Sequence, residues 1–183
     1  MLFGKSFVGL YSFGGIIHIF KEANHYKRNI MERTLLIIKP GAVQRGLIGQ
    51  IITRLENRGL KLVAMKMAQL DKEILKVHYA HLVEKPFYPT LEASMMAAPV
   101  ILTAWEGVQA VSVVREMAGA TEGKKAVPGT LRGDFCMSHQ ENVVHTSDSL
   151  ETAEKELARF FKPEDFFDYP SPLLHYLYST DEL

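Results

Sequence analysis

Four β-prone runs alternate with helix-like segments along residues 34–161, and this order restricts the chain to a few folds. Strands are expected at 34–38, 60–70, 99–105 and 134–138, the last carried on toward residue 145. Apolar periodicity and capping residues predict helices at 46–58, 71–84, 91–97, 107–118 and 149–161. We expect Gly59 to end the first of these helices and Asp71 to cap the second. Asp148 and Glu151 have the spacing of a capping box before the last helix.

The order β-α-β-α-β-α-β-α, with few strands, indicates the fold class. It favours an α+β sandwich of the ferredoxin-like kind, a four-stranded antiparallel sheet with helices covering one face. A doubly wound parallel sheet is the alternative that the same order allows. The sheet is expected within residues 31–183, which we take as one domain.

Residues 1–30 differ from the rest of the chain. They are rich in glycine and aromatic residues, and Lys21 and Glu22 follow the apolar part where a signal peptide would have its cleavage site. Gly14, Gly15 and His18 interrupt any membrane-spanning helix there. We expect residues 1–30 to be an extension, disordered or absent from the native protein, and we expect no membrane attachment.

The overall charge restricts the kinds of partner. The chain of 183 residues has 21 basic and 21 acidic side chains, so no bulk field attracts nucleic acid or an anionic membrane. Nucleic-acid binding on a ferredoxin-like domain would need a basic face, which this balance disfavours. Cys136 is the only cysteine, which fits a reducing compartment and a cytoplasmic location.

His145 is the candidate nucleophile. It ends a short apolar run and is followed at once by residues that start a helix, which is a setting for phosphate chemistry. A serine-type triad with Ser147 and Asp148 is excluded, because such close neighbours cannot point at one another in that geometry. A nucleophilic imidazole needs a partner for its second nitrogen, and Glu156 in the following helix can supply it. A hydrogen-bonded structural histidine is the other interpretation of His145 that the residues leave open.

A metal site at this histidine lacks ligands. His78 and His81 share a helix face, but no acidic or cysteine cluster accompanies them. We therefore expect no metal held by protein side chains alone.

Phosphates would have to be bound by side chains, because no phosphate-binding loop is present. Gly41 and Gly46 have the first spacing of a Walker loop, but Leu47 and Ile48 stand where lysine and serine or threonine belong. The candidate cations are Lys39, Arg115 and Arg132. Each has a structural interpretation alone, and together they can neutralise a triphosphate.

A base-stacking surface is also present. Phe87, Tyr88 and Leu91 cluster in and after a turn bracketed by prolines. The cluster is either an apolar cap under a loop or a platform for a nucleotide base.

Four stretches together resemble the nucleoside diphosphate kinase family. They are NVVHTSDS at 142–149, IKPGAVQRG at 38–46, PGTLRGDF at 128–135 and WEG at 105–107. The resemblance extends from about residue 32 to residue 178, without a gap between the motifs. In that family, a histidine takes the γ-phosphate of a nucleoside triphosphate, typically ATP, and passes it to a nucleoside diphosphate.

The resemblance implies a role for each matching position. His145 would be phosphorylated, Glu156 would orient it, and Ser147 would lie close by. Phosphates and sugar would contact a further set of residues: Lys39, Tyr79, Arg115, Thr121, Arg132 and Asn142. Phe87 would stack on the base beside Leu91, with little discrimination among bases. Kinetics would be ping-pong, and Mg²⁺ would be carried by the nucleotide phosphates with few or no direct protein ligands.

Three positions depart from the family's usual pattern. Thr146 replaces a glycine after the histidine, so its backbone must avoid a conformation that only glycine adopts. Gly41 replaces an aspartate near Lys39. His139 stands where a small apolar residue usually meets the other face of the base, and an imidazole can stack there as well.

The family resemblance also implies a homo-oligomer, either a hexamer or a tetramer. The apolar C-terminal segment 163–178 is expected to pack on the core or on a neighbouring subunit. The alternative function is a nucleotide-binding regulatory module on the same fold that does not turn over. Loss of His145, Lys39 or the arginines would signal such a module, and none is lost.

Overall fold

The computed structural model describes residues 31–171 and 174–179. The expected extension at 1–30 lies outside the described residues. Among the described helices, none is long and apolar enough to cross a membrane.

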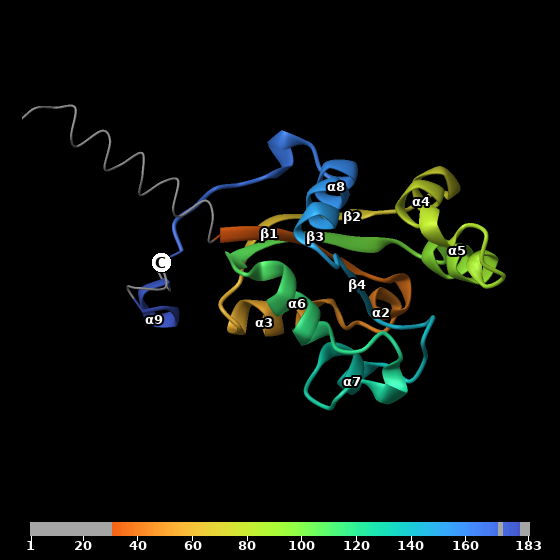
Figure 1. The fold of residues 1–183 in the computed structure, drawn as a ribbon, viewed down its shortest axis with the longest axis horizontal. Helices are drawn as coiled ribbons and strands as arrows, with labels where there is room; N and C mark the ends of the chain where they lie inside the picture. Colours follow the sequence, from red (N-terminus) through yellow and green to blue (C-terminus); the bar gives the residue numbers. More distant parts are fainter. Residues whose placement is uncertain (1–30, 172–173, 180–183) are drawn as a thin grey trace, which may run out of the picture.

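The core of the fold is one four-stranded antiparallel sheet with the order β2-β3-β1-β4 (Figure 1). Its strands are β1 (Met31–Ile38), β2 (Lys61–Ala68), β3 (Val100–Val108) and β4 (Val144–Thr146). β1 pairs with β3 and β4, and β2 pairs with β3, each time antiparallel. The expected ferredoxin-like sheet is therefore confirmed, and the parallel alternative is wrong.

Helices cover both faces of the sheet, not one as expected (Figure 1). The helices are α2 (Pro40–Gln44), α3 (Ile48–Asn57), α4 (Lys72–His78), α5 (Tyr88–Met96), α6 (Ala110–Ala118), α7 (Leu131–Phe135), α8 (Leu150–Phe160) and α9 (Leu174–Leu177). Short 3₁₀ turns lie at Ala80–Leu82, Gly123–Lys125 and Pro163–Asp165. α4, α5 and α8 pack on one face, and α2, α3, α6 and α7 pack on the other.

The central strand β1 is buried on both faces of the sheet, and this burial accounts for its sequence. Leu35 and Ile37 point into one core, and Leu36 and Ile38 point into the other. All four are fully buried, so the strand is a continuous apolar run without polar alternation.

The prediction of a strand at 134–138 is wrong. Residues 131–135 form α7, because the Thr130 hydroxyl caps it by accepting a hydrogen bond from the Gly133 N–H at 3.0 Å. The Cys136 N–H then donates to the Arg132 carbonyl, which completes the last turn. Local capping thus overrides the β-propensity of this segment, and the fourth strand is limited to β4.

Other helix boundaries also differ from expectation. The helix expected at 46–58 is α3, which begins only at Ile48, because Gly46 takes a left-handed conformation (φ 68°) just before it. The short helix α2 precedes this range. The helix expected at 71–84 ends at His78 and continues as a 3₁₀ turn. The predicted Asp71 cap is present, with the Ile74 N–H donating to it at 2.9 Å. α8 is capped by the Ser149 hydroxyl and not by the expected Asp148.

The C-terminal segment crosses the edge of the sheet at β2. The Phe167 N–H donates to the Val63 carbonyl, and Lys61 pairs with Asp168 at 2.8 Å. Phe166 packs against the core under α8, whereas Phe167 stays exposed. This segment therefore packs partly on the domain itself.

A buried hydrogen-bonded pair in the sheet gives a stability prediction. The Thr103 hydroxyl donates to the Leu36 carbonyl at 2.7 Å and accepts from Trp105 Nε1 at 2.8 Å. Thr103→Val keeps the shape but leaves a buried indole N–H unpaired, so we expect the free energy of unfolding to fall by about 1–3 kcal/mol. Urea denaturation measures it. Ser112→Ala, which removes an exposed hydroxyl, is the control, and equal effects of the two variants would contradict the account.

Candidate active site

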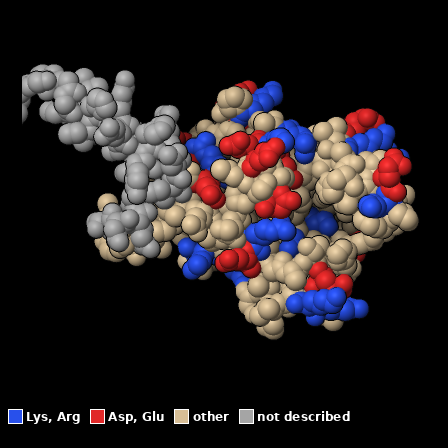
Figure 2. Space-filling model, viewed as in Figure 1, with Lys and Arg blue, Asp and Glu red and all other residues tan. Residues whose placement is uncertain are grey.

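A cavity of about 310 Å³ opens where β4, α4, α5 and the loop before β4 meet. Figure 2 shows basic side chains inside a hollow between the surface formed by α8 and that formed by α4 and α5. Every predicted site residue except Ser147 lines this cavity: Lys39, Tyr79, Phe87, Leu91, Arg115, Thr121, Arg132, Asn142, His145 and Glu156. The structure therefore brings together residues that are more than a hundred positions apart.

The register of β4 decides where His145 points. His145 lies opposite Ile37 of β1, and cross-strand partners share a face of the sheet. Ile37 belongs to the core under α8. His145 therefore faces α8, while its neighbour Val144 packs into the opposite core. A shift of one residue would turn His145 away from its partner.

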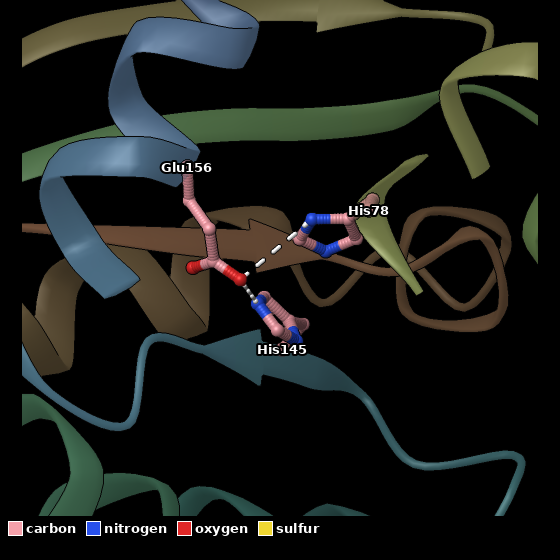
Figure 3. Close-up of side chains that lie close together, drawn as sticks. All are labelled: His78, His145 and Glu156. Carbon is pink, nitrogen blue, oxygen red and sulfur yellow. Dashed lines mark hydrogen bonds and ion pairs between the residues drawn. The ribbon is translucent and has the colours of Figure 1, made fainter. Parts of the chain in front are cut away.

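Glu156 joins His145 and Ser147 (Figure 3). His145 Nε2 lies 2.9 Å from Glu156 Oε1, and the Ser147 hydroxyl donates to Oε2 at 2.6 Å. Because a carboxylate only accepts, His145 Nε2 carries the proton of the neutral ring. Its Nδ1 therefore keeps a lone pair, and the side chain lines the cavity, 21% exposed.

The carboxylate of Glu156 stays ionised although it is buried. Burial alone would raise its pKa, but the hydrogen bonds from His145 and Ser147 outweigh burial and hold the pKa below its usual value. The site thus keeps a negative charge behind the imidazole.

Lys39 directly follows β1 and lines the cavity as a buried cation. Its ammonium donates to the Gln140 carbonyl at 2.9 Å and to Asn142 Oδ1 at 3.4 Å. Burial lowers the pKa of Lys39 to about 8, with Arg132 lowering it further and Glu141 opposing the shift. A cation destabilised in this way gains from an anionic ligand.

Arg132 is a second buried cation at the cavity wall. Its Nη1 donates to the Gly119 carbonyl at 2.6 Å and its Nη2 to the Val144 carbonyl at 2.9 Å. These bonds fix the guanidinium plane, and each terminal nitrogen keeps a second hydrogen for a ligand. The Nε of Arg132 is buried and has no hydrogen-bond partner within residues 31–171 and 174–179. Burial lowers the pKa of Arg132 as well.

The remaining predicted residues lie around the mouth and wall of the cavity. Arg115 and Thr121 are exposed there, and Phe87 is 40% exposed. Leu91 is buried beside the cavity. Tyr79 is also buried, and burial raises the pKa of its hydroxyl, so it remains a donor at neutral pH.

The three departures from the family pattern have structural consequences. Thr146 lies in β4 opposite Leu36, and among the described non-glycine residues only Gln109 has positive φ. Thr146 therefore avoids the glycine-only conformation, as expected. At Gly41, an added Cβ would lie 3.8 Å from Glu141 Oε2, so a carboxylate is still close to this position. His139 lines the cavity.

Two possible metal arrangements differ in their fit. His78, His145 and Glu156 offer three ligand atoms within 4.8 Å of one another, but nitrogen-rich sets do not suit Mg²⁺. The acids lining the cavity are Glu156, already hydrogen-bonded, and Asp148, which is exposed. Mg²⁺ is usually bound by one or two carboxylates, waters and substrate phosphates. The exposed Asp148 is therefore the acid in this cavity that a divalent cation carried by phosphates would face.

Two functional neighbours were missed from the sequence. His78 packs against His145, and Arg159 donates to His78. Sequence patterns suggest only a metal-ligand role for His78, together with His81. The spacing of Glu156 and Arg159, three residues apart on one helix, was the available signal.

The antiparallel α+β sheet and the imidazole–carboxylate pair in a cationic cavity define a phosphate-handling enzyme domain. A family model described as nucleoside diphosphate kinase matches residues 32–166. The chain belongs to this nucleoside diphosphate kinase family.

Individual relatives agree with that assignment. The chain is 58% identical over 152 residues to a nucleoside diphosphate kinase from Parabacteroides distasonis. The matched region covers 83% of this chain and 99% of that relative. It is 54% identical over 142 residues to one from Pyrococcus horikoshii, covering 76% of this chain and 90% of the relative. Among solved structures, a halophilic nucleoside diphosphate kinase from Halobacterium salinarum in complex with CDP superposes with a TM-score of 0.79 at 40% identity, covering 81% of this chain and 99% of that chain.

Removing the Ser147 hydroxyl should weaken the stabilisation of the ionised Glu156 carboxylate. In Ser147→Ala, Oε2 loses its donor, so we expect the pKa of Glu156 to rise and the free energy of unfolding at pH 7 to fall by about 1–3 kcal/mol. A depressed carboxyl pKa stabilises the fold above the unfolded pKa, and this stability is lost as the pH falls through the folded pKa. The difference in the free energy of unfolding between Ser147→Ala and the wild type should therefore become smaller at acidic pH.

Carbon-detected NMR titration of the glutamates measures this change directly. Exposed Glu151, whose pKa is lowered by Lys155, is the internal reference and should not move. An unchanged pKa of Glu156 would refute the role given to Ser147.

Proposed function

We propose that the chain transfers the γ-phosphate of a nucleoside triphosphate, typically ATP, to a nucleoside diphosphate through a phosphohistidine on His145. The observation that carries this proposal is the 2.9 Å contact between His145 Nε2 and Glu156 Oε1, with the ring lining the cavity. It leaves Nδ1 unprotonated and free to attack.

The chemical step needs no proton transfer. The lone pair of Nδ1 forms a bond to the γ-phosphorus, the bond from phosphorus to the bridging oxygen breaks, and the nucleoside diphosphate leaves with that electron pair. The ring then becomes cationic, and the Glu156 carboxylate stabilises it through the Nε2–H. The reverse attack by a second nucleoside diphosphate restores the neutral imidazole. One site serves donor and acceptor in turn, so the kinetics are ping-pong.

The cations of the cavity would hold the phosphates. Lys39 and Arg132 are buried and fixed by backbone carbonyls, and Arg115 lies at the exposed side. Fixed positive charge stabilises the transferring phosphoryl oxygens without reorganisation. Mg²⁺ arriving with the nucleotide would neutralise part of the phosphate charge, and Asp148, the exposed acid that lines the cavity, would face it. The Tyr79, Thr121 and Asn142 side chains would add hydrogen bonds to phosphates and sugar.

Base binding would depend on stacking. Phe87 and Leu91 lie on one side of the cavity, and His139 also lines it. Stacking is tolerant of base identity because every base has a π face. We therefore propose broad base specificity, with His139 changing affinity and not activity.

We also propose a cytoplasmic homo-oligomer, a hexamer or a tetramer. Support comes from the edge strand β2, where Met65 and Met67 are 54% and 59% exposed. Such an exposed apolar edge is commonly covered by another chain. The buried Cys136 suits a reducing compartment. Light scattering of the intact chain should give four or six times the monomer mass, and a monomer would contradict the proposal.

Replacing the nucleophile tests the central step. His145→Gln should abolish acid-labile labelling of the protein by [γ-³²P]ATP, because a glutamine amide cannot accept the phosphoryl group. His175→Gln, an exposed histidine in α9, is the matched control and should label normally. Persistent acid-labile label on the His145 variant would remove His145 from its assigned role.

A further inference from the structure

His78 is a buried histidine that the phosphoryl transfer described above does not use. It is the last residue of α4, and its side chain is fully buried. The ring packs edge-on against His145 and Tyr79, with centroids 4.5 Å away in each case, and against Phe160 at 5.0 Å. It therefore forms the wall behind the candidate nucleophile.

Arg159 fixes the protonation of His78. Arg159 Nη1 lies 3.1 Å from His78 Nδ1, and a guanidinium can only donate. Nδ1 therefore accepts, and the neutral ring carries its proton on Nε2, which is buried without a hydrogen-bond partner among the described residues. Burial lowers the pKa of His78 to about 3, helped by His145, Arg159 and His81 and opposed by Glu156.

The other tautomer would compete with His145. His78 Nδ1 lies 3.6 Å from Glu156 Oε1, the same oxygen that His145 Nε2 contacts at 2.9 Å (Figure 3). A proton on His78 Nδ1 would point toward Glu156 Oε1, and this oxygen would then accept from both His78 and His145. The carboxylate would then stabilise the charge developing on His145 less well, because one oxygen would serve two donors.

We propose that Arg159 and His78 are positioning residues that reserve Glu156 Oε1 for His145. Arg159 holds His78 with its Nδ1 lone pair occupied, and the His78 ring then packs against His145 without competing for the carboxylate. This inference rests on the proposed function of His145 and adds two residues that act through Glu156.

The placement of these groups on α8 supports the assignment. Glu156 and Arg159 are three residues apart and so lie on one face of the helix. Phe160, on the same helix, packs edge-on against the His78 ring. A single rigid element thus carries the carboxylate, the donor that controls its neighbour, and a packing surface for that neighbour.

Metal binding by the same cluster is the competing interpretation. His78, His145 and Glu156 form a set that suits a transition metal by ligand type. However, the lone pair of His78 Nδ1 already accepts from Arg159, and a bound cation would face the guanidinium at short range. The geometry therefore favours positioning over metal binding.

The test uses the full chain and three variants. Arg159→Leu removes the donor, Arg159→Lys keeps a donor, and Lys155→Leu is the matched control. Lys155 is an exposed cation on the same helix, and in the described part of the chain its ammonium pairs with Glu151 at 2.6 Å. Long-range ¹H–¹⁵N NMR of the free protein gives the tautomer of His78. Rapid-quench labelling with MgATP gives the rate of His145 phosphorylation and its KM.

We expect the wild type to show His78 protonated on Nε2. Arg159→Leu should populate the Nδ1–H form and slow phosphorylation at saturating MgATP about tenfold, the effect of one ordinary hydrogen bond, with KM within about twofold. Arg159→Lys should restore most of the rate, and Lys155→Leu should match the wild type.

Four results would overturn the proposal: an Nδ1–H tautomer in the wild type, an unchanged rate in Arg159→Leu, an equal loss in Lys155→Leu, or stoichiometric Co²⁺ binding to the wild type that shifts the His78 signals. Absence of any phosphoenzyme in the wild type would instead refute the proposed function, while the tautomer measurement would remain valid.

Discussion

The carboxylate of Glu156 is buried between α8 and β4, and an ionised group in that place is stable only with donors on both oxygens. His145 supplies one donor and Ser147 the other. Both come from β4 and the residue after it, so the strand must pair with β1 in one register. The same requirement fixes α8, because the helix must present Glu156 where the strand presents its donors. The local arrangement of strand, turn and helix therefore follows from satisfying one buried charge.

Much of the fold could be predicted from sequence patterns, and the failures have local causes. The apolar run of β1 and the Asp71 cap identified their elements, because both signals are contained in a few neighbouring residues. The strand expected at 134–138 failed because a threonine cap and a helix-closing hydrogen bond override β-propensity over five residues. The coverage of both faces of the sheet depends on where helices pack after the chain turns, which periodicity alone does not record.

The site was predictable to the extent that its residues lie in motifs. Lys39, Arg132 and Glu156 each had an ordinary structural explanation, and only their convergence on one cavity separates function from packing. Whether that cavity existed was a question of tertiary structure. His78 and Arg159 escaped notice because their importance depends on a contact between α4 and α8, and neither residue has a distinctive sequence setting. A chain with no net charge can still concentrate cations in one cavity, as this chain does.

The central claim is that one histidine receives a phosphoryl group from one nucleotide and gives it to another at the same site. The most direct measurement is to label the protein with [γ-³²P]ATP, remove the nucleotides, and add UDP or GDP with Mg²⁺. The account predicts that the label leaves the protein and appears in UTP or GTP in equal amount. Label that stays on the protein, or that is released as inorganic phosphate, would contradict it.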